Sequence, residues 1–243
     1  MNSESRFMNR ENEMPPPFDT DIIIPVWNQW ELTVKCLQSI KRYSQGYRLI
    51  VINNGSEKAD WDKIEKELAL HRNVLVIDNA NNLGFVKAVN QGINAVKAPF
   101  TVLMNNDTEA VYSWLQKLRT PLLVNKKIVL SGPLTTTPDS WQGKYPKNRV
   151  GWIERGSGML AFFCTMFRSE IFKTVGLLDE AFGVGFGDDD DYCMRVLKAG
   201  FKMALVQDLV IPHHHRSTFK KLYSAETISE MQKTAINRFY EKH

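Results

Sequence analysis

The feature that most constrains the fold is a regular alternation of short apolar runs and amphipathic segments between residues 22 and 104. Largely apolar runs of strand length lie at 22–26, 47–52, 73–77 and 100–104. Between them, apolar residues recur at every third or fourth position, which is the spacing of one helix face. Strands and helices that alternate at these lengths form parallel sheets through right-handed crossovers. The sequence therefore predicts an α/β protein with a mostly parallel central sheet and helices on both faces.

Side chains that can hydrogen-bond a ligand follow each of these runs. They are Trp27 and Asn28, then Asn53, Asn54 and Ser56, then Asn82, and finally Asn105, Asn106 and Asp107. In open parallel sheets, ligands bind beyond the carboxyl ends of the strands. Asn and Asp also form ordinary turns, but their presence after every strand favours a polar ligand, and a nucleotide is the usual occupant of such a crevice.

The remaining segments surround this core. Residues 1–17 are polar and end in Met-Pro-Pro-Pro, which can continue neither a helix nor a central strand, so we expect a disordered tail or linker. The alternation ends beyond about residue 130, and 135–158 is a loop-rich, aromatic segment that we expect to cover a site. Helices are expected at 168–175, 191–199 and 225–240, and a strand at 202–211.

Composition bounds the class of protein. Hydrophobic residues make up 43% of the 243 residues and charged residues 24%, as in ordinary globular proteins. The net charge of +4 suits an anionic small molecule or membrane surface, but it is too small to predict a nucleic-acid partner. Cys36, Cys164 and Cys193 are widely spaced, which predicts a reduced, cytoplasmic compartment. We expect neither a membrane-spanning helix nor a signal peptide.

Four consecutive aspartates, Asp188–Asp191, stand between a glycine-rich run and a segment with helical spacing. A calcium loop beginning at Asp188 is excluded, because Cys193 would occupy the position of the required Gly and Ala199 that of the required Glu. A solvated acidic turn is the other simple interpretation, but apolar residues crowd the run on both sides. Burial and mutual repulsion raise the pKa of carboxyl groups. We therefore expect one or two of these acids to act as a general base, and the others to cap the helix or bind water.

Two other segments could bind a cation. Asp107 follows an apolar strand, where its carboxylate can bind a hard divalent cation and, through it, a diphosphate. An ordinary Asn-Asp turn is the alternative. In the extended segment His213–His215 alternate side chains share a face, so His213 and His215 would point together and His214 away. Histidines so arranged can bind a transition metal, and a structural role is the alternative.

One glycine motif is misleading. The segment 156–161, "GSGMLA", includes Gly158 and has the spacing of a dinucleotide-binding fingerprint. That fingerprint must follow a strand and open a helix, so we interpret this segment as a flexible turn into an apolar strand. The sequence has no P-loop motif.

Taken in order, the motifs from residue 21 to residue 215 resemble those of the family 2 inverting glycosyltransferases, which have the GT-A fold. The segment "DIIIPVWN" resembles the first strand of the family, "VINNGS" its nucleotide-binding turn and "NLGFVKAVNQGI" its third helix. The segment "LMNNDT" resembles the D-x-D position, and "GDDDDYCMRVLKAGF" resembles the E-D-x-D-x-x-x-R segment. The ordered set is specific, and the rhamnosyltransferase-like branch is the most similar.

The resemblance implies a Rossmann-like GT-A domain over 18–243, with a nucleotide-sugar-binding half at 18–110 and an acceptor-binding, catalytic half at 111–243. It also implies that a sugar moves from a nucleoside-diphosphate sugar to an acceptor hydroxyl with inversion. Asp189 matches the general base of the family, and Asp188 stands in for the glutamate before it.

The resemblance assigns further residues to the site. The nucleotide pocket would include Pro25, Trp27, Asn28, Asn53, Asn54, Asn82, Lys87, Asn105 and Asn106. Asp107, His213 and His215 would bind Mn²⁺ or Mg²⁺, while Asp191, Arg195 and Gly158 match other positions of the family motifs.

The sequence departs from the family pattern at two of these positions. Asn53 stands where many members carry an Asp against the base, and Asn105 replaces the first Asp of D-x-D. The implied metal therefore has one charged ligand fewer. A nucleotide-sugar-binding module without turnover is an alternative function. A sugar nucleotidyltransferase would have a Gly-rich, Arg-containing loop after the first strand, where "PVWNQW" stands instead.

The sequence leaves the acceptor open among a glycan, a lipid-linked glycan and a protein side chain. We expect a role in polysaccharide or glycoconjugate synthesis, in the cytoplasm or at the inner face of the membrane. The helix at 225–240, which follows Lys220 and Lys221, could touch a membrane surface, but packing on the core is the interpretation we favour.

Overall fold

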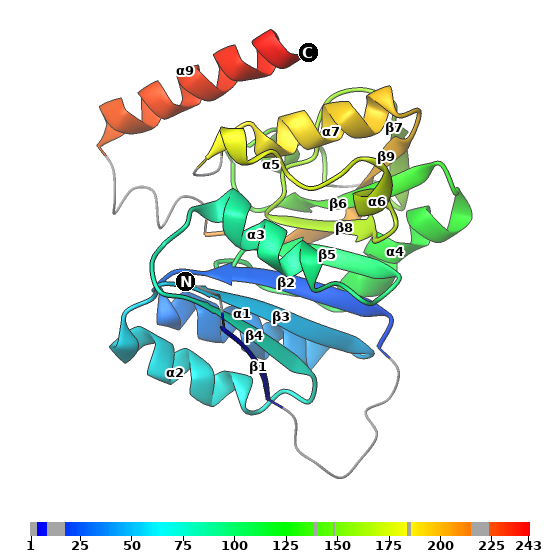
Figure 1. Cartoon of the computed structure of the whole chain (residues 1–243). Coiled ribbons are helices and arrows are strands. Elements are labelled where there is room, and N and C mark those ends of the chain that lie inside the picture. Colours follow the sequence, from blue (N-terminus) through cyan, green and yellow to red (C-terminus); the bar gives the residue numbers. More distant parts are fainter. Residues whose placement is uncertain (1–3, 9–17, 139, 148, 184–185, 215–223) are drawn as a thin grey trace.

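The structure is a computed structural model that describes residues 4–8, 18–138, 140–147, 149–183, 186–214 and 224–243. Its described strands form one nine-stranded sheet, in the order β1-β4-β3-β2-β5-β8-β6-β9-β7 (Figure 1). The strands are β1 Glu4–Met8, β2 Thr20–Val26, β3 Tyr47–Asn54, β4 Val74–Asn79, β5 Phe100–Met104, β6 Ile128–Thr135, β7 Trp152–Arg155, β8 Cys164–Arg168 and β9 Lys202–Ile211.

Most of the strands share one direction. The pairs β2–β3, β2–β5, β3–β4 and β6–β9 are parallel. Strand β8 lies antiparallel between β5 and β6, so these two also point the same way. The ends of β2, β3, β4, β5, β6 and β9 therefore lie along one side of the sheet, which we call the carboxyl edge. The prediction of a mostly parallel α/β sheet is confirmed.

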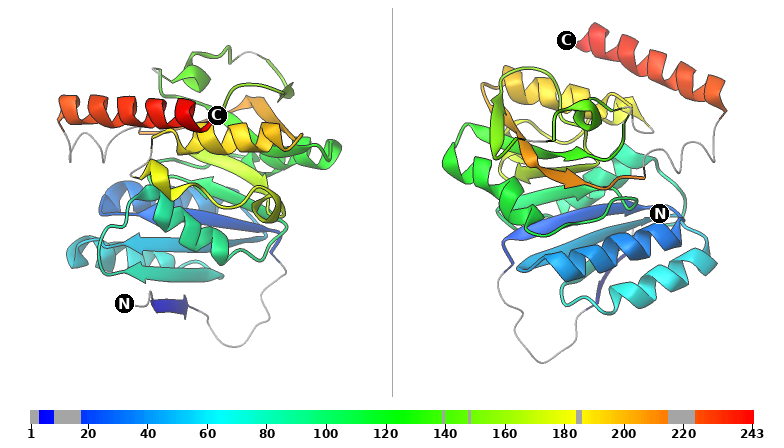
Figure 2. Two further views of the ribbon diagram at one scale, coloured as in Figure 1. Left: turned by 45° about the horizontal axis from the view of Figure 1, so that its top comes forward. Right: turned by 180° about the vertical axis from the view of Figure 1, so that it is seen from behind.

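Helices cover both faces of the sheet (Figure 2). One face packs against α1 Trp30–Tyr43, α2 Lys58–Leu68 and α4 Trp114–Val124, and the other against α3 Phe85–Asn94 and α7 Asp188–Lys198. Ile22 and Ile24 lie in the first core and Ile23 in the second, all fully buried. Because both faces are covered, the central strands β2, β3, β4 and β5 read as largely apolar runs in the sequence.

The other described helices lie outside these layers. They are the short α5 Trp141–Lys144, α6 Ile171–Thr174 and the 3₁₀ helix η1 Glu180–Phe182, and the long C-terminal α9 Ala225–Lys242. Helix α9 lies beside α7 and not against the sheet (Figures 1 and 2).

The prediction of a tail over residues 1–17 is wrong for Glu4–Met8. These residues form β1 and pair antiparallel with β4, with Glu4 opposite Asp78 and Met8 opposite Val74. Without β1, the outer backbone groups of β4 would be an unpaired sheet edge, and natural proteins cover such edges. The rest of 1–17 lies outside the described residues.

The sequence analysis also missed α4, β6 and β7. Pro121 lies inside α4 and interrupts its helical pattern. Strand β6 contains Ser131, Gly132 and Pro133, which are poor strand formers, and its pairing with β9 shifts register after Pro133. Helix α7 begins at Asp188, three residues before the predicted start at 191, so all four aspartates occupy its first turn.

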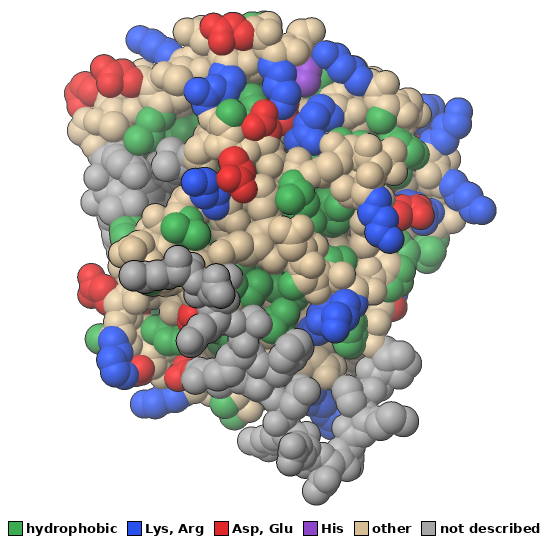
Figure 3. All heavy atoms as spheres, in the orientation of Figure 1, with side chains coloured by type: hydrophobic (Ala, Val, Ile, Leu, Met, Phe, Trp, Pro, Cys, Tyr) green, Lys and Arg blue, Asp and Glu red, His purple; other side chains and the backbone are tan. Residues whose placement is uncertain are grey.

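The surface has mixed charge. On the face shown in Figure 3, acidic and basic side chains lie next to one another, including over the end of α9. No helix in the described part of the chain is both long and apolar enough to span a bilayer.

Candidate functional site

The loops after β2 and β3 are tied together at the carboxyl edge. The backbone N–H of Asn28 donates to Ser56 Oγ at 2.9 Å, and Asn28 Oδ1 accepts from the N–H of Glu57 at 2.7 Å. Asn28 and Gln29 have φ of 53° and 56°, which lets the chain turn sharply before α1. Asn28 and Ser56 thus hold the two loops to each other. Pro25 and Trp27 lie half-buried beside them.

Amide side chains connect β3, β4 and the following loop. Asn53 Nδ2 donates to Asp78 Oδ1 at 3.0 Å, and Asn53 Oδ1 accepts from the N–H of Ser56. Asn54 Nδ2 donates to Asn82 Oδ1 at 2.9 Å, and Asn54 Oδ1 accepts from Asn79 Nδ2 at 3.1 Å. The predicted residues Asn53, Asn54 and Asn82 are therefore brought together.

The sequence analysis missed Asp78 and Asn79. They directly follow Ile77, where the sequence analysis ended the strand, so they carry the same signal of polar residues after a strand as Asn53 and Asn54, which was overlooked here. Asp78 is a half-buried carboxyl group, so the acid that position 53 lacks is present on the neighbouring strand.

Asp107 and His213 meet although they lie far apart in the sequence. A β-bridge between Thr108 and His213 places the loop after β5 beside the end of β9. His213 Nε2 lies 3.2 Å from Asp107 Oδ1, and both side chains are at most 10% exposed. The His213 ring stacks on Phe163, with ring centres 5.0 Å apart. The geometry thus fixes an imidazole nitrogen next to a carboxylate at the carboxyl edge. His215 lies outside the described residues.

The two asparagines before Asp107 have different environments. Asn106 Nδ2 donates to Thr33 Oγ1 on α1 at 2.9 Å. Asn105 Oδ1 is buried and has no hydrogen-bond partner among the described residues. A buried polar atom of this kind calls for a missing donor or a cation.

The acidic turn of α7 begins on the same side of the molecule as the carboxyl edge (Figures 1 and 2). Burial, aided by the charges of Asp190 and Asp191, raises the pKa of Asp188 to about 7. Burial and the neighbouring Asp188 raise the pKa of Asp189 well above its usual range, and burial also raises that of Asp190. Several carboxyl groups here therefore keep protons nearer to neutral pH than free aspartates do, as the sequence predicts.

Asp191 behaves differently from its neighbours. Burial opposes its ionisation, but hydrogen bonds from Lys242 and His243 and the charge of Arg195 outweigh burial and lower its pKa. Lys242 Nζ and His243 Nε2 lie 2.6 and 2.9 Å from Asp191 Oδ1, and Arg195 Nε lies 2.9 Å from Asp191 Oδ2. These contacts join the end of α9 to α7.

Arg195 also ties α7 to the segment before η1. Its two terminal nitrogens donate to the carbonyl oxygens of Val175 and Leu177 at 2.8 and 2.9 Å. Asp191 and Arg195, which each match a position of the family motif, thus form an intramolecular ion pair that braces the first turn of α7.

Two predicted residues lie away from these contacts. Lys87 is exposed on the first turn of α3. Gly158 lies in an exposed turn with φ of 78°, and β8 follows this turn instead of a helix. The interpretation of 156–161 as a turn and not a dinucleotide fingerprint is confirmed.

Comparison with known proteins assigns the chain to a family. A family model described as Glycosyl transferase family 2 matches residues 21–176, more than half of the chain. The chain belongs to glycosyl transferase family 2. Its family segment runs from the start of β2 through the Asp107 loop to the residues after α6.

Curated relatives agree with this family. The chain is 24% identical over 229 residues to a pre-mycofactocin glycosyltransferase of Mycobacterium tuberculosis, covering 85% of this chain and 45% of the relative. It is 28% identical over 112 residues to an uncharacterized glycosyltransferase of Haemophilus influenzae, covering 46% of this chain and 35% of the relative. The chain therefore spans less than half the length of these relatives.

Solved structures confirm the GT-A fold. GalNAc-T7, crystallised with UDP, GalNAc and Mn²⁺, matches with a TM-score of 0.68 and 15% identity, over 81% of this chain and 43% of that one. The mannosyltransferase PcManGT from Pyrobaculum calidifontis, in complex with GDP-Man and Mn²⁺, matches with a TM-score of 0.68 and 14% identity, over 84% and 60% of the two chains.

Proposed function

We propose that the protein moves a sugar from a nucleoside-diphosphate sugar to an acceptor hydroxyl with inversion at the anomeric carbon. One observation carries this proposal. Asp107 and His213 face each other at the carboxyl edge, 3.2 Å apart, and the acidic turn of α7 begins on the same side of the molecule. A diphosphate bound at Asp107 and His213 would direct its sugar toward Asp188 and Asp189.

The donor set at Asp107 and His213 fits a divalent cation. Carboxylate oxygen and imidazole nitrogen together suit Mn²⁺ better than Mg²⁺, which prefers oxygen ligands alone. The described residues include no group of three candidate ligands, so the diphosphate would have to complete the coordination. When bound there, the cation would offset negative charge on the leaving diphosphate. The buried Asn105 Oδ1 lies in the same loop and can accept a ribose or water hydrogen bond.

Asp189 is our proposed general base. Its raised pKa brings its basicity closer to the operating pH, where a general base is most effective. Asp189 would take the proton of the acceptor hydroxyl while the hydroxyl oxygen attacks the anomeric carbon and the diphosphate leaves. Attack from the side opposite the leaving group inverts the configuration. Asp188, with a pKa of about 7, would be about half protonated near neutral pH, which limits the charge in this buried turn.

The donor pocket would use the first half of the sheet. Asp78, oriented by Asn53 at 3.0 Å, would accept an N–H from the nucleobase, the role that the sequence analysis sought at residue 53. Pro25 and Trp27 would flank the base, and Lys87 would add positive charge at the start of α3, where a helix N-terminus favours phosphate.

We also propose a donor sugar, a pathway class and a cellular compartment. Resemblance to the rhamnosyltransferase-like branch supports a hexose or deoxyhexose donor and a role in polysaccharide or glycoconjugate synthesis. The three cysteines are buried and unpaired, which suits a cytoplasmic enzyme that acts in solution or at the inner membrane face.

The variant Asp189→Asn tests the proposal. Against a panel of UDP-, GDP- and dTDP-sugars with Mn²⁺, the variant should lose transfer by at least about a hundredfold, the lower range for a general base. Its affinity for the nucleotide sugar should stay unchanged. The matched control is Asp62→Asn, an exposed aspartate on α2 that pairs with Lys58. Unchanged transfer by Asp189→Asn would refute the assigned base, and wild-type binding without any transfer would instead indicate a binding module.

A further inference from the structure

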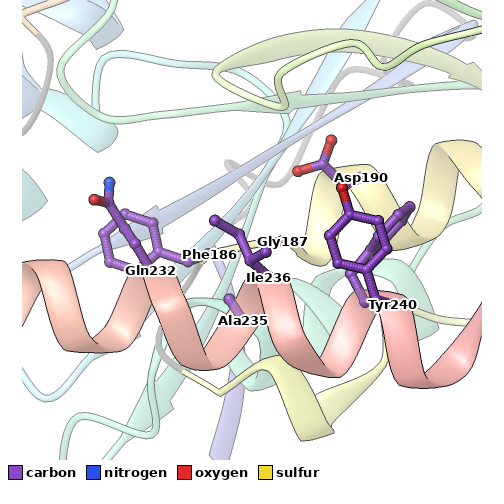
Figure 4. A pocket seen from close by; sticks show the side chains of 8 residues that line it. Phe186, Gly187, Asp190, Gln232, Ala235, Ile236 and Tyr240 are labelled. Atoms are coloured by element: carbon purple, nitrogen blue, oxygen red, sulfur yellow. The ribbon is translucent and has the colours of Figure 1, made fainter.

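A cavity of about 490 Å³ lies between the start of α7 and the inner side of α9 (Figure 4). Its walls include apolar groups of Phe186, Ile236 and Phe239, and the polar side chains of Asp190 and Gln232. Tyr240 extends along the same opening, next to the Asp190 carboxylate in Figure 4. A volume of this size lies within the ~300–1,000 Å³ range of small-molecule sites.

Contacts between α7 and α9 hold the two walls of the cavity in place. At one end, Lys242 and His243 bond the fully buried carboxylate of Asp191 and fix the end of α9. Toward the other end, small residues meet: a Cβ atom built on Gly187 would lie 3.4 Å from Ala235 Cβ. Because neither residue carries a large side chain, the start of α7 and the middle of α9 can approach closely here.

The lining combines flat apolar side chains with hydrogen-bonding groups, as carbohydrate-binding sites do. A pyranose ring has an apolar face of C–H groups and a rim of hydroxyl groups. Aromatic side chains such as Phe239 and Tyr240 provide flat apolar surfaces for the C–H face. Asp190 can accept hydrogen bonds from hydroxyls, and Gln232 can both donate and accept them.

We propose that this cavity binds the sugar ring of a glycan acceptor, so that the acceptor of this enzyme is a glycoside and not a peptide or a bare lipid. The inference rests on the proposed function, since Asp190 directly follows the proposed base Asp189 on α7. A ring held against Asp190 would present a hydroxyl at the start of α7. A lipid chain alone would cover the Asp190 carboxylate without bonding it, and such a buried, unpaired polar group is costly.

Two substitutions on α9 form a matched test. Ile236→Trp fills the cavity, and because Ile236 is 55% exposed the larger ring should not disturb folding. Asn237→Trp places the same ring on the next residue, which is exposed and does not line the cavity. A third variant, Gln232→Ala, removes the amide and leaves the cavity open.

Binding is measured by saturation-transfer NMR with the methyl glycosides of glucose, galactose, mannose, rhamnose and N-acetylglucosamine. A short Ser/Thr peptide and farnesyl phosphate serve as comparison probes. Affinity for nucleotide sugars with Mn²⁺ is measured separately on each variant. We expect at least one glycoside to bind the wild type and Asn237→Trp equally. Its affinity should fall about tenfold or more, ~1.4 kcal/mol, in Ile236→Trp and Gln232→Ala, while nucleotide-sugar affinity stays the same.

The outcomes separate this inference from the proposed function. Nucleotide-sugar binding and turnover without glycoside binding would overturn the inference and leave the proposed function standing. Equal glycoside binding by Ile236→Trp and the wild type, or saturation of the peptide or farnesyl phosphate instead of the glycosides, would also overturn it. Glycoside binding lost in Ile236→Trp, in a protein that neither binds nor turns over any nucleotide sugar, would support the sugar pocket and refute the proposed function.

Discussion

Replacing Asp188 with Asn should stabilise the protein at neutral and alkaline pH. Burial raises the pKa of Asp188 from 3.8 to about 7. Between these two pH values, the native state holds a proton on Asp188 that the unfolded state has already released. The free energy of unfolding therefore falls as the pH rises from about 4 to about 7, and this loss is complete above pH ~7. The asparagine side chain has nearly the same shape and does not ionise, so the variant should lack this loss.

The size of the effect follows from the two pKa values. Their difference corresponds to about 4 kcal/mol, at ~1.4 kcal/mol for each pKa unit. This value is an upper bound, because Asp188 shares its proton equilibria with the adjacent aspartates. For a chain of this length, ~1 kcal/mol shifts the melting temperature by ~2–4 °C, so the melting temperature at pH ~8 should rise by up to roughly 8–16 °C.

The assay is urea unfolding of wild type and Asp188→Asn at several pH values between about 4 and about 8, without added metal. The two stabilities should converge at the acid end and separate as the pH rises. Asp62→Asn, at the exposed surface, is the control and should follow the wild-type profile. Parallel profiles for wild type and Asp188→Asn, or a variant that is less stable at pH ~8, would refute the reasoning.

Two further predictions concern the loops and the contact with α9. Gly55→Ala should destabilise the fold by at least ~1 kcal/mol in urea unfolding. The reason is that Gly55 has φ of 76° and an added Cβ would lie 2.5 Å from the backbone carbonyl carbon of Asn81. Unchanged stability would contradict the described packing of these loops. Asp191→Asn should destabilise the protein by about 2–4 kcal/mol at pH ~7, because it leaves Arg195 and Lys242 without their buried anion. Both cations are partly exposed, so water offsets part of the lost interaction. Since the pKa of Asp191 is lowered below 3.8, its stabilisation is present above pH ~4 and is lost as the pH falls further, so wild type and variant should converge in acid; a constant difference down to pH ~2 would count against this contact.

Several elements could be predicted from the sequence because they depend on local pattern. Strands β2, β3, β4 and β5 are continuous apolar runs, since both faces of the sheet are covered, and their order gives the parallel half of the fold. Strand β6 could not be recognised, because Ser131, Gly132 and Pro133 hide a strand that lies in the middle of the sheet.

In the candidate site, too, some features could be predicted from the sequence and others could not. The polar residues after the strands and the acidic turn are visible in the sequence, and the resemblance paired Asp107 with His213. The contact of Lys242 and His243 with Asp191 has no local signal, because it joins two helices through side chains about 50 positions apart in the sequence. The hydrogen bond that turns Asn53 toward Asp78 likewise depends on strand register, which the sequence does not display.

The most direct test of the account is a crystal structure of the chain with Mn²⁺ and a nucleoside-diphosphate sugar, with the metal located by anomalous scattering. The account predicts one metal peak within coordination distance, ~2.0–2.3 Å, of Asp107 and His213 Nε2. The donor sugar should lie between that peak and the Asp189 carboxylate, in one shared cavity. A metal bound elsewhere, or a sugar whose anomeric carbon faces away from Asp189, would contradict it.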